Sequence, residues 1–508
     1  MFKVTRFHIL LNTIVALCIT LASYIHVPLN STEGRLMYFF HLLITQASFA
    51  GVLYLLTLNR LVFKIIFSSL FLLLGFIAFW VYTINISISQ ALIEATLTSK
   101  SYIIKDLFSL QLIIVIIVMI LVLWFILRQY KSIQPTKGIK LFLPLSLVLI
   151  TLFFYADYKR TNSFRSKLPY ALFYAIGEHF TKDDTKLKQT PKIVDEEKLN
   201  NLKIVLVLGE SLRADHLSLN GYPRETTPML SKRNNVISFN NVFTNKGNTA
   251  LSLPCILTDQ SIYSEDKDSL QSIFSVYNAL DVPTFWIGNQ LLETSYKSIV
   301  ETNESVEIID KLKSYWNINK KQDLQLLPSF KDKIRTNSKG LFTLHMIGSH
   351  WWYEDKYTEN FRKFKPIIEG KYIPSLEKQE IINSYDNTIL YLDNFLNEVI
   401  STLEKDSAPT VMIYISDHGE SLGENGRWLH SHSEGLTKPG MIVWYSEKFK
   451  TRFPNKTSSL IKNKNKELST DIIFHSLIDL SQTKTLDFDL SKSIFFNGYE
   501  LKKENPEQ

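Results

Sequence analysis

The chain has 508 residues, 45% of them hydrophobic and 13% aromatic, and a formal net charge of +7. That charge is modest for the length, and no basic stripe carries interleaved aromatic residues, so we expect no nucleic-acid partner. Cys18 lies in an apolar segment, and Cys255 stands alone in the polar half. The polar half therefore has neither an internal disulfide nor a cysteine-based metal site.

The N-terminal part of the chain is built from apolar stretches long enough to cross a bilayer as helices. They carry almost no ionisable residues, which argues against buried helices of a soluble protein and against a transporter path. The first is too long for a removed signal peptide and lacks a cleavage site. We expect five spans, at Phe7–Val27, Met37–Leu58, Leu61–Ile84, Leu110–Leu127 and Leu141–Tyr155.

Lysine and arginine are distributed unequally between the short loops, and the richer side is expected to be cytoplasmic. One side has Lys3, Arg6, Arg60, Lys64, Arg128, Lys131, Lys137 and Lys140, whereas the other has Arg35, Lys100 and Lys105. An odd number of spans then places everything after Tyr155 outside. The prediction is a multi-pass membrane protein with an external C-terminal domain.

The segment that follows the last span has a helical pattern. Residues 163–180 place apolar side chains three and four positions apart, which indicates an amphipathic helix. It could lie in the membrane interface or pack on the soluble domain. We therefore divide the chain into a five-helix transmembrane domain (1–156), an interfacial helix and linker (157–200), and a catalytic domain (201–508).

From about residue 201, apolar runs alternate with helical patterns such as 377–404. The runs are rich in Val, Ile and Phe, as in strands buried on both faces of a parallel sheet. They are residues 203–210, 283–289, 340–350, 409–420 and 440–446. Such alternation predicts an α/β domain with helices on both faces. The expected fold is thus an all-α transmembrane bundle followed by an α/β/α domain.

Polar side chains that can hold a metal follow three of these runs. Glu210 ends the first, His350 the third, and Asp417 and His418 lie near the end of the fourth. Ligands bind beyond the carboxyl ends of strands in open α/β sheets, so these groups should converge. Each alone would be a helix cap or a core histidine. Together their oxygen and nitrogen atoms suit Zn²⁺, with Mn²⁺ or Mg²⁺ as alternatives.

A nucleophile is expected in NKGNTALSLPC, residues 245–255. Gly247 and Asn248 can form a turn, so that Thr249 opens a helix whose positive end suits a phosphate. Near a metal, the Thr249 hydroxyl would ionise close to neutral pH and attack phosphorus. The alternative is that Thr249 only caps the helix.

Four motifs resemble the phosphoethanolamine transferases that modify bacterial lipid A and core oligosaccharide, a branch of the alkaline phosphatase superfamily that includes the transferable polymyxin-resistance enzymes. They are VLGESLRADHLSLNGYPRETTP (207–228), NTALSLPC (248–255), HMIGSH (345–350) and SDHGESLGENGRWLH (416–430). The five spans match as well. The resemblance thus covers nearly the whole chain and implies an alkaline-phosphatase-like catalytic domain.

The resemblance implies roles for particular residues. Zinc would be bound by Glu210, Thr249, Asp417 and His418, with Thr249 becoming phosphorylated. Other residues would contact the transferred group, namely His350 and His430, which would also assist proton transfer, and Asn289. The implied reaction moves phosphoethanolamine from phosphatidylethanolamine to lipid A or the lipopolysaccharide core and releases diacylglycerol. The resemblance also implies a multi-pass protein of the cell inner membrane with its catalytic domain in the periplasm, and we expect a monomer in contact with membrane lipids.

The chain also departs from the family. The disulfides common in its members cannot form, and Trp351, Trp352 and Tyr353 replace the usual Gly-Pro after His350. These aromatic residues are either a packing or interface cluster or a surface for the ethanolammonium. Another envelope glycan could therefore be the acceptor.

Other activities fit the sequence less well. A sulfatase would need a Cys or Ser nucleophile followed by x-Pro-x-Arg, which is not found near Thr249. A glycerol-phosphate transferase of the lipoteichoic acid synthase type shares the five spans and the threonine, but residues 209–222 fit it poorly. A scaffold without activity would have lost at least one ligand.

Overall fold

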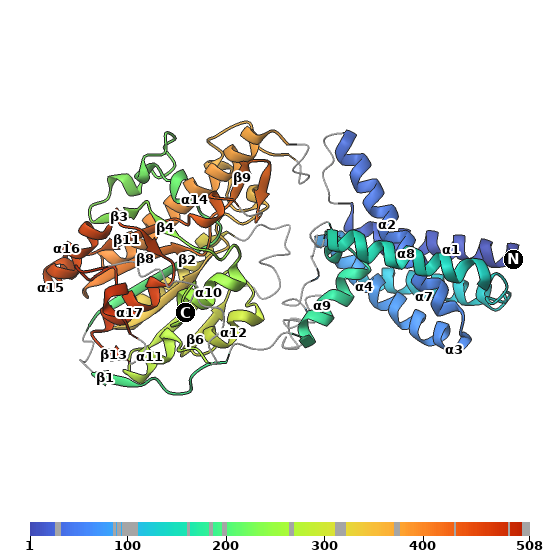
Figure 1. Cartoon of the computed structure of the whole chain (residues 1–508), viewed down its shortest axis with the longest axis horizontal. Helices are drawn as coiled ribbons and strands as arrows, with labels where there is room; N and C mark the ends of the chain where they lie inside the picture. Colours follow the sequence, from blue (N-terminus) through green and yellow to red (C-terminus); the bar gives the residue numbers. More distant parts are fainter. Residues whose placement is uncertain are drawn as a thin grey trace. The chain divides into compact units, whose positions relative to one another are not determined.

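The computed structural model describes residues 1–25, 32–84, 88, 93, 110–159, 163–181, 186–195, 201–263, 269–309, 322–369, 376–430, 433–485 and 488–499. Two compact units follow one another along the chain, residues 1–181 and residues from 182 onward. Each unit has its own packing and is described separately (Figure 1).

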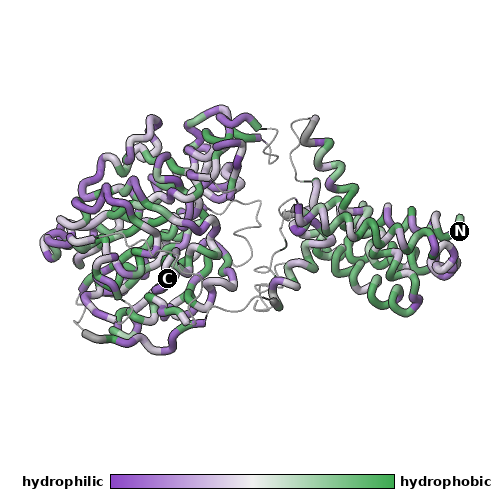
Figure 2. The backbone as a smooth tube through the Cα atoms, in the orientation of Figure 1, coloured by the Kyte–Doolittle hydropathy of each residue, from purple (hydrophilic) through white to green (hydrophobic). Residues whose placement is uncertain are grey.

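The N-terminal unit contains five helices long and apolar enough to cross a membrane, as predicted. Figure 2 shows that hydrophobic residues predominate along these helices. The spans are Phe2–Ser23, Arg35–Thr57, Arg60–Thr83, Leu110–Tyr130 and Ile139–Lys159. They are built from α1 (Phe2–Cys18) with η1 (Thr20–Ser23), α2 (Thr32–Thr57), α3 (Arg60–Val62) with η2 (Phe63–Phe67) and α4 (Ser68–Ile84), α7 (Leu110–Tyr130), and α8 (Ile139–Lys159). The loop lysines Lys100 and Lys105 lie outside the described residues.

Close packing and a buried acid organise this unit. Helix α2 packs along α8, where a Cβ at Gly51 would meet the Ser146 carbonyl oxygen at 2.9 Å, so only glycine permits this approach. Near the end of α8, the buried Asp157 accepts a hydrogen bond from the Phe164 backbone and pairs with Arg165 at 3.2 Å. Asp157 thereby fixes the turn that leaves the last span.

The segment predicted as one amphipathic helix is divided. A 3₁₀ turn, η3 (Ser163–Ser166), precedes α9 (Tyr170–Thr181). Pro169 separates them, because a proline disfavours helical backbone at the preceding residue but is tolerated where a helix begins. On α9, Leu172 is buried whereas Phe173 and Phe180 are exposed, so the helix has an apolar exposed side.

The C-terminal unit is built around a seven-stranded mixed sheet of order β3-β11-β8-β2-β7-β5-β6. Six strands are mutually parallel and β11 runs antiparallel to both neighbours, which differs from the all-parallel arrangement expected. The strands are β2 (Lys203–Gly209), β3 (Val236–Phe239), β5 (Thr284–Gly288), β6 (Ser305–Ile308), β7 (Gly340–His345), β8 (Thr410–Ser416) and β11 (Met441–Tyr445). Strands β3 and β6 escaped prediction because each is short and only partly buried.

Helices cover both faces of this sheet (Figure 1). Alternate side chains of β2 and β8 join a core with α10 (Thr249–Leu257), α11 (Ile273–Ala279), α12 (Thr294–Val300) and α17 (Ile472–Ser481). The side chains between them face the other layer, made of α13 (Leu327–Thr336) and α14 (Lys378–Glu404). The predicted fold class, an all-α bundle followed by an α/β/α unit, is confirmed.

Smaller elements complete this unit. Two helices follow β11, α15 (Glu447–Arg452) and α16 (Pro454–Asn463). Three two-stranded pairs flank the sheet: β1 (Ile193–Asp195) with β13 (Lys484–Thr485), β4 (Val242–Phe243) with β12 (Leu468–Ser469), and β9 (Ser421–Glu424) with β10 (Arg427–Leu429). The pairing of β1 with β13 makes residues before 201 part of the C-terminal unit.

Candidate active site

The central strands of the sheet bring three acidic and basic groups to one edge. Strands β2 and β8 are parallel neighbours, so Glu210 after β2 and Asp417–His418 after β8 leave the sheet at the same end. All three are almost completely buried, with no more than 1% of each exposed. Such side chains lose their hydration, so they need partners or a bound ion to offset that cost.

Thr249 is the first residue of α10. The side chain of Asn248 caps the helix by accepting a hydrogen bond from the Leu251 backbone at 3.0 Å. The cap is therefore Asn248, which leaves the Thr249 hydroxyl free to donate to Glu210 Oε2 at 2.7 Å. The positive end of the helix points toward this hydroxyl, which favours a negative group there.

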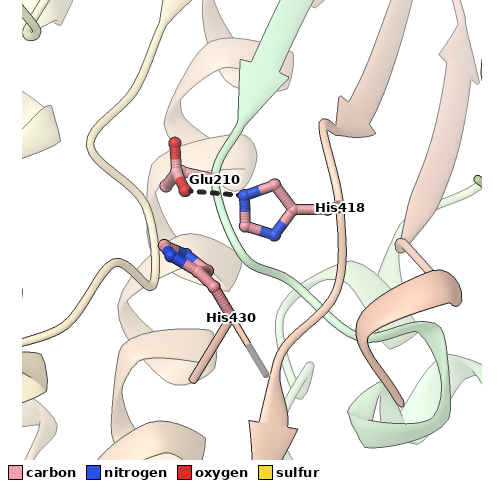
Figure 3. Close-up of side chains that lie close together, drawn as sticks. All are labelled: Glu210, His418 and His430. Atoms are coloured by element: carbon pink, nitrogen blue, oxygen red, sulfur yellow. Dashed lines mark ion pairs between the residues drawn. The ribbon is translucent and has the colours of Figure 1, made fainter. Parts of the chain in front are cut away.

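The imidazole of His418 lies between two carboxylates. Its Nε2 is 3.2 Å from Glu210 Oε1 and 3.3 Å from Asp417 Oδ2 (Figure 3 shows the first pair). Its Nδ1 donates to the Gly419 carbonyl oxygen at 2.7 Å, which directs Nε2 to the centre. Neither His418 Nε2 nor Asp417 Oδ2 has a hydrogen-bond partner among the described residues. Two orphaned buried atoms facing one point fit a metal cation.

The electrostatics of these groups support the same interpretation. Burial alone would lower the pKa of His418. The nearby Asp417 and Glu210 carboxylates outweigh that effect and raise the pKa to about 10. Burial and the charge of Glu210 raise the pKa of Asp417 to about 7. The site thus retains protons where a divalent cation would supply positive charge, and binding such a cation would displace them.

Two further histidines lie beside this centre. The ring of His430 is 4.9 Å from that of His418 and 6.0 Å from that of His350, measured between centroids. Glu210, His418 and His430 offer ligand atoms within 4.8 Å of one another, so His430 could also hold a metal (Figure 3). His430 therefore lies beside His418, and His350 lies beside His430.

Asn289 is placed differently from the other predicted site residues. Its Nδ2 donates to Asp323 Oδ1 at 2.9 Å, and the side chain is fully buried. Only its Oδ1, which has no hydrogen-bond partner within the described part of the chain, remains to contact a substrate. The next residue, Gln290, contacts Glu210 instead.

Several residues that shape the site were not predicted. Gln290 follows a strand end, so the rule that found Glu210 could have found it. Asp323 had no such signal, because it lies on no strand; it accepts hydrogen bonds from the backbones of Ile347 and Gly348 and thereby holds the segment before His350. Gly348 has φ +51° and lies against Glu210, whose backbone would be 2.8 Å from an added Cβ. Only glycine fits there.

The aromatic residues after His350 have two environments. Tyr353 is completely buried and packs edge-on against Tyr385 of α14 at 5.3 Å, so it belongs to the core. Trp351 and Trp352 are half-buried and meet at right angles, with centroids 5.2 Å apart. Packing therefore accounts for Tyr353, while the two tryptophans keep exposed surface beside the site.

Comparison with known proteins defines the class to which this fold and site belong. The sequence pattern of the sulfatase family matches residues 203–483, more than half of the chain. The chain is a member of the sulfatase family.

Particular relatives are phosphoethanolamine transferases. Phosphoethanolamine transferase EptA of Escherichia coli K12 is 30% identical over 321 residues, which are 59% of this chain and 57% of EptA. The soluble domain of lipooligosaccharide phosphoethanolamine transferase A from Neisseria meningitidis is 29% identical, with a TM-score of 0.56, and covers 62% of this chain and 97% of that domain. The integral membrane form of the Neisseria protein, 23% identical, shares the fold over 96% of this chain and 98% of its own, with a TM-score of 0.60.

Proposed function

We propose that this protein transfers phosphoethanolamine from phosphatidylethanolamine to lipid A or the lipopolysaccharide core through a phosphorylated Thr249. The observation that carries the proposal is the hydrogen bond from the Thr249 hydroxyl, at the positive end of α10, to Glu210. Glu210 in turn offers ligand atoms within 4.8 Å of those of His418 and His430. The names of the relatives support the transferred group and the class of acceptor.

In the first step, the Thr249 hydroxyl gives up its proton and its oxygen attacks the phosphorus of the donor. The bond from Thr249 to phosphorus forms as the bond to the diacylglycerol oxygen breaks, and the leaving oxygen takes up a proton. In the second step, an oxygen of the acceptor gives up its proton and attacks the same phosphorus. The bond between Thr249 and phosphorus breaks, and the leaving Thr249 oxygen takes up a proton to regenerate the hydroxyl. We assign these proton transfers to His350 and His430, whose rings lie 6.0 Å apart, with that of His430 4.9 Å from the ring of His418.

We assign the metal to Glu210, Thr249, Asp417 and His418. The oxygen and nitrogen donors suit Zn²⁺ better than Mn²⁺ or Mg²⁺, which favour all-oxygen sites. A bound Zn²⁺ would lower the pKa of the Thr249 hydroxyl and offset charge on the phosphoryl oxygens. Glu210 would accept the hydroxyl hydrogen bond in the resting protein and keep the oxygen aligned.

We further propose that the protein is a monomer of the inner membrane with its catalytic unit in the periplasm. The excess of lysine and arginine on one side of the five spans supports this orientation. Reporters fused at Gln134 and at Gln508 should give opposite signals. Matching signals would place the loop and the catalytic unit on the same side and refute the orientation.

The reaction is tested with purified full-length protein and phosphatidylethanolamine labelled in its head group. Label should appear on Thr249 first and then on lipid A or the lipopolysaccharide core, with diacylglycerol released in step. Label from phosphatidylglycerol on Thr249, with none from phosphatidylethanolamine, would instead support a glycerol-phosphate transferase. Transfer to a different envelope glycan would correct the acceptor alone.

A further inference from the structure

The end of β5 directs two neighbouring side chains to different parts of the site. Asn289 bonds Asp323, whereas Gln290, only 2% exposed, directs its amide toward Glu210. Gln290 Nε2 donates to the Met346 carbonyl oxygen at 2.5 Å and to Glu210 Oε2 at 3.4 Å. An amide nitrogen carries two hydrogens, so one group serves both acceptors. The Met346 bond fixes the amide, and the second hydrogen then points at Glu210.

The two oxygens of Glu210 have separate partners. Oε1 accepts from Ser211 Oγ at 3.0 Å and contacts His418, whereas Oε2 accepts from Thr249 and Gln290. In the proposed reaction, Thr249 gives up its proton and then carries phosphorus, so it stops donating to Oε2. The amide of Gln290 has no proton to lose near neutral pH and can donate at every stage.

We infer that Gln290 is a positioning residue that holds the Glu210 carboxylate in its metal-binding orientation, above all while Thr249 cannot donate to it. The inference rests on the proposed function in assigning Glu210 as a metal ligand and, for the stage at which Thr249 carries phosphorus, in the covalent route. Partners of this kind, which touch a ligand but not the metal, typically contribute about 10–100-fold to metal affinity or activity.

The test replaces Gln290 by methionine, which has a similar volume and no N–H group. Gln271 provides a matched control, because it is 1% exposed and its Nε2 donates to the Ser272 carbonyl oxygen at 3.3 Å. Full-length protein is stripped of metal and titrated with Zn²⁺ against a competing chromophoric chelator, without substrate. We expect Gln290→Met to weaken Zn²⁺ binding by about 10–100-fold and Gln271→Met to leave it unchanged.

A second measurement separates positioning from folding. At saturating Zn²⁺, Gln290→Met should lower kcat by about tenfold or more while KM for the donor stays the same. The reason is that Gln290 acts through Glu210, which it contacts. Thermal unfolding of the metal-free proteins checks that both methionine variants fold. Gln290→Asn, which keeps an amide too short to bridge both acceptors, should give an intermediate Zn²⁺ affinity.

The outcomes are distinguishable. Wild-type Zn²⁺ affinity in both Gln290 variants, or an equal loss in Gln271→Met, would overturn the inference. If Gln290→Met does not fold, Gln290→Asn decides by the same titration. A wild-type protein that binds Zn²⁺ in a Gln290-dependent way but takes no label from phosphatidylethanolamine would refute the proposed reaction and leave the role of Gln290 standing.

Discussion

The two units of this chain place their apolar and polar side chains in opposite ways. In the spans, large apolar residues such as Leu121 and Trp124 are about 60% exposed. In the described part of the C-terminal unit, few large apolar residues are exposed, and the charged groups Glu210, Asp417 and His418 are buried. The exposed apolar side chains of the first unit are suited to contact with lipid, whereas the second unit buries charged side chains away from water.

This difference shows where function resides in the chain. The spans satisfy their backbone groups within each helix and present lipid-compatible surfaces, so they suit anchoring. Among the described residues, His418 Nε2 and Asp417 Oδ2 at the sheet edge are buried without a hydrogen-bond partner, and a bound cation would satisfy both. We therefore assign catalysis to the C-terminal unit and access to the lipid donor to the N-terminal unit. The following predictions test that division.

The largest effect is expected at the nucleophile. Thr249→Ala should reduce transfer by at least about 10⁴-fold, because no covalent intermediate can form. Thr258→Ala is the matched control: Thr258 is a buried threonine at the end of the same helix, bonded to the Pro254 carbonyl oxygen. Rates of head-group transfer measure both variants. Normal transfer by Thr249→Ala would reject the covalent route.

Substitutions of the proposed metal ligands should have a different effect on Zn²⁺ binding from substitution of the neighbouring His430. Asp417→Ala and His418→Ala should each weaken Zn²⁺ binding by more than about 100-fold, which is the upper end of the effect of a residue that contacts a ligand but not the metal. Both variants should therefore lose transfer. His430→Ala should keep most of the metal and slow turnover by about 10²-fold, through loss of proton transfer. Metal content by mass spectrometry, with turnover at saturating Zn²⁺, checks both. Loss of the metal from His430→Ala would make His430 a ligand.

Anchoring is tested by removing the spans. A fragment starting before Leu187 keeps the pairing of β1 with β13, which a fragment starting at residue 201 would lose. It should bind Zn²⁺ and cleave small soluble phosphodiesters slowly. Transfer from vesicles should fall by about 10²-fold or more, because the donor is no longer held at high local concentration. Equal transfer by the fragment and the full chain would show that the spans contribute no access.

The last prediction concerns the dependence of Zn²⁺ affinity on pH. The pKa of His418 at about 10 and that of Asp417 at about 7 both lie above the ordinary values, so both groups hold protons that Zn²⁺ must displace. Affinity should therefore rise with pH, by up to about 100-fold per unit where two protons leave and about tenfold where one leaves. Competition titrations between about pH 6 and pH 8 measure the slope. An affinity that falls as the pH rises would contradict the site described.

Length and composition were enough to predict the spans. Each predicted span overlaps an observed one, and the boundaries differ because an apolar run does not fix where its helix begins. Continuous apolar runs also predicted the buried strands β2, β5, β7, β8 and β11. The antiparallel direction of β11 could not be predicted, because a strand buried on both faces has the same composition in either direction.

The site was predicted only as far as strand ends could show. The rule that strands present ligands at their carboxyl ends brought Glu210 and His418 together, and a helix start placed Thr249. It could not distinguish Asn289 from Gln290, because adjacent residues after a strand point in different directions. Asp323 was missed because its contacts join segments far apart in the sequence.

The cysteines bear on how the protein matures. Cys18 and Cys255 are the only two, both are free thiols, and they lie in different units. Neither unit therefore depends on thiol oxidation to reach its fold, and no disulfide isomerase is needed for it. Cys255 lies on α10, the helix that Thr249 begins, where burial raises its pKa to about 12 and keeps it an unreactive thiol. The catalytic unit should accordingly be producible in a reducing cytoplasm and withstand oxidants at this cysteine.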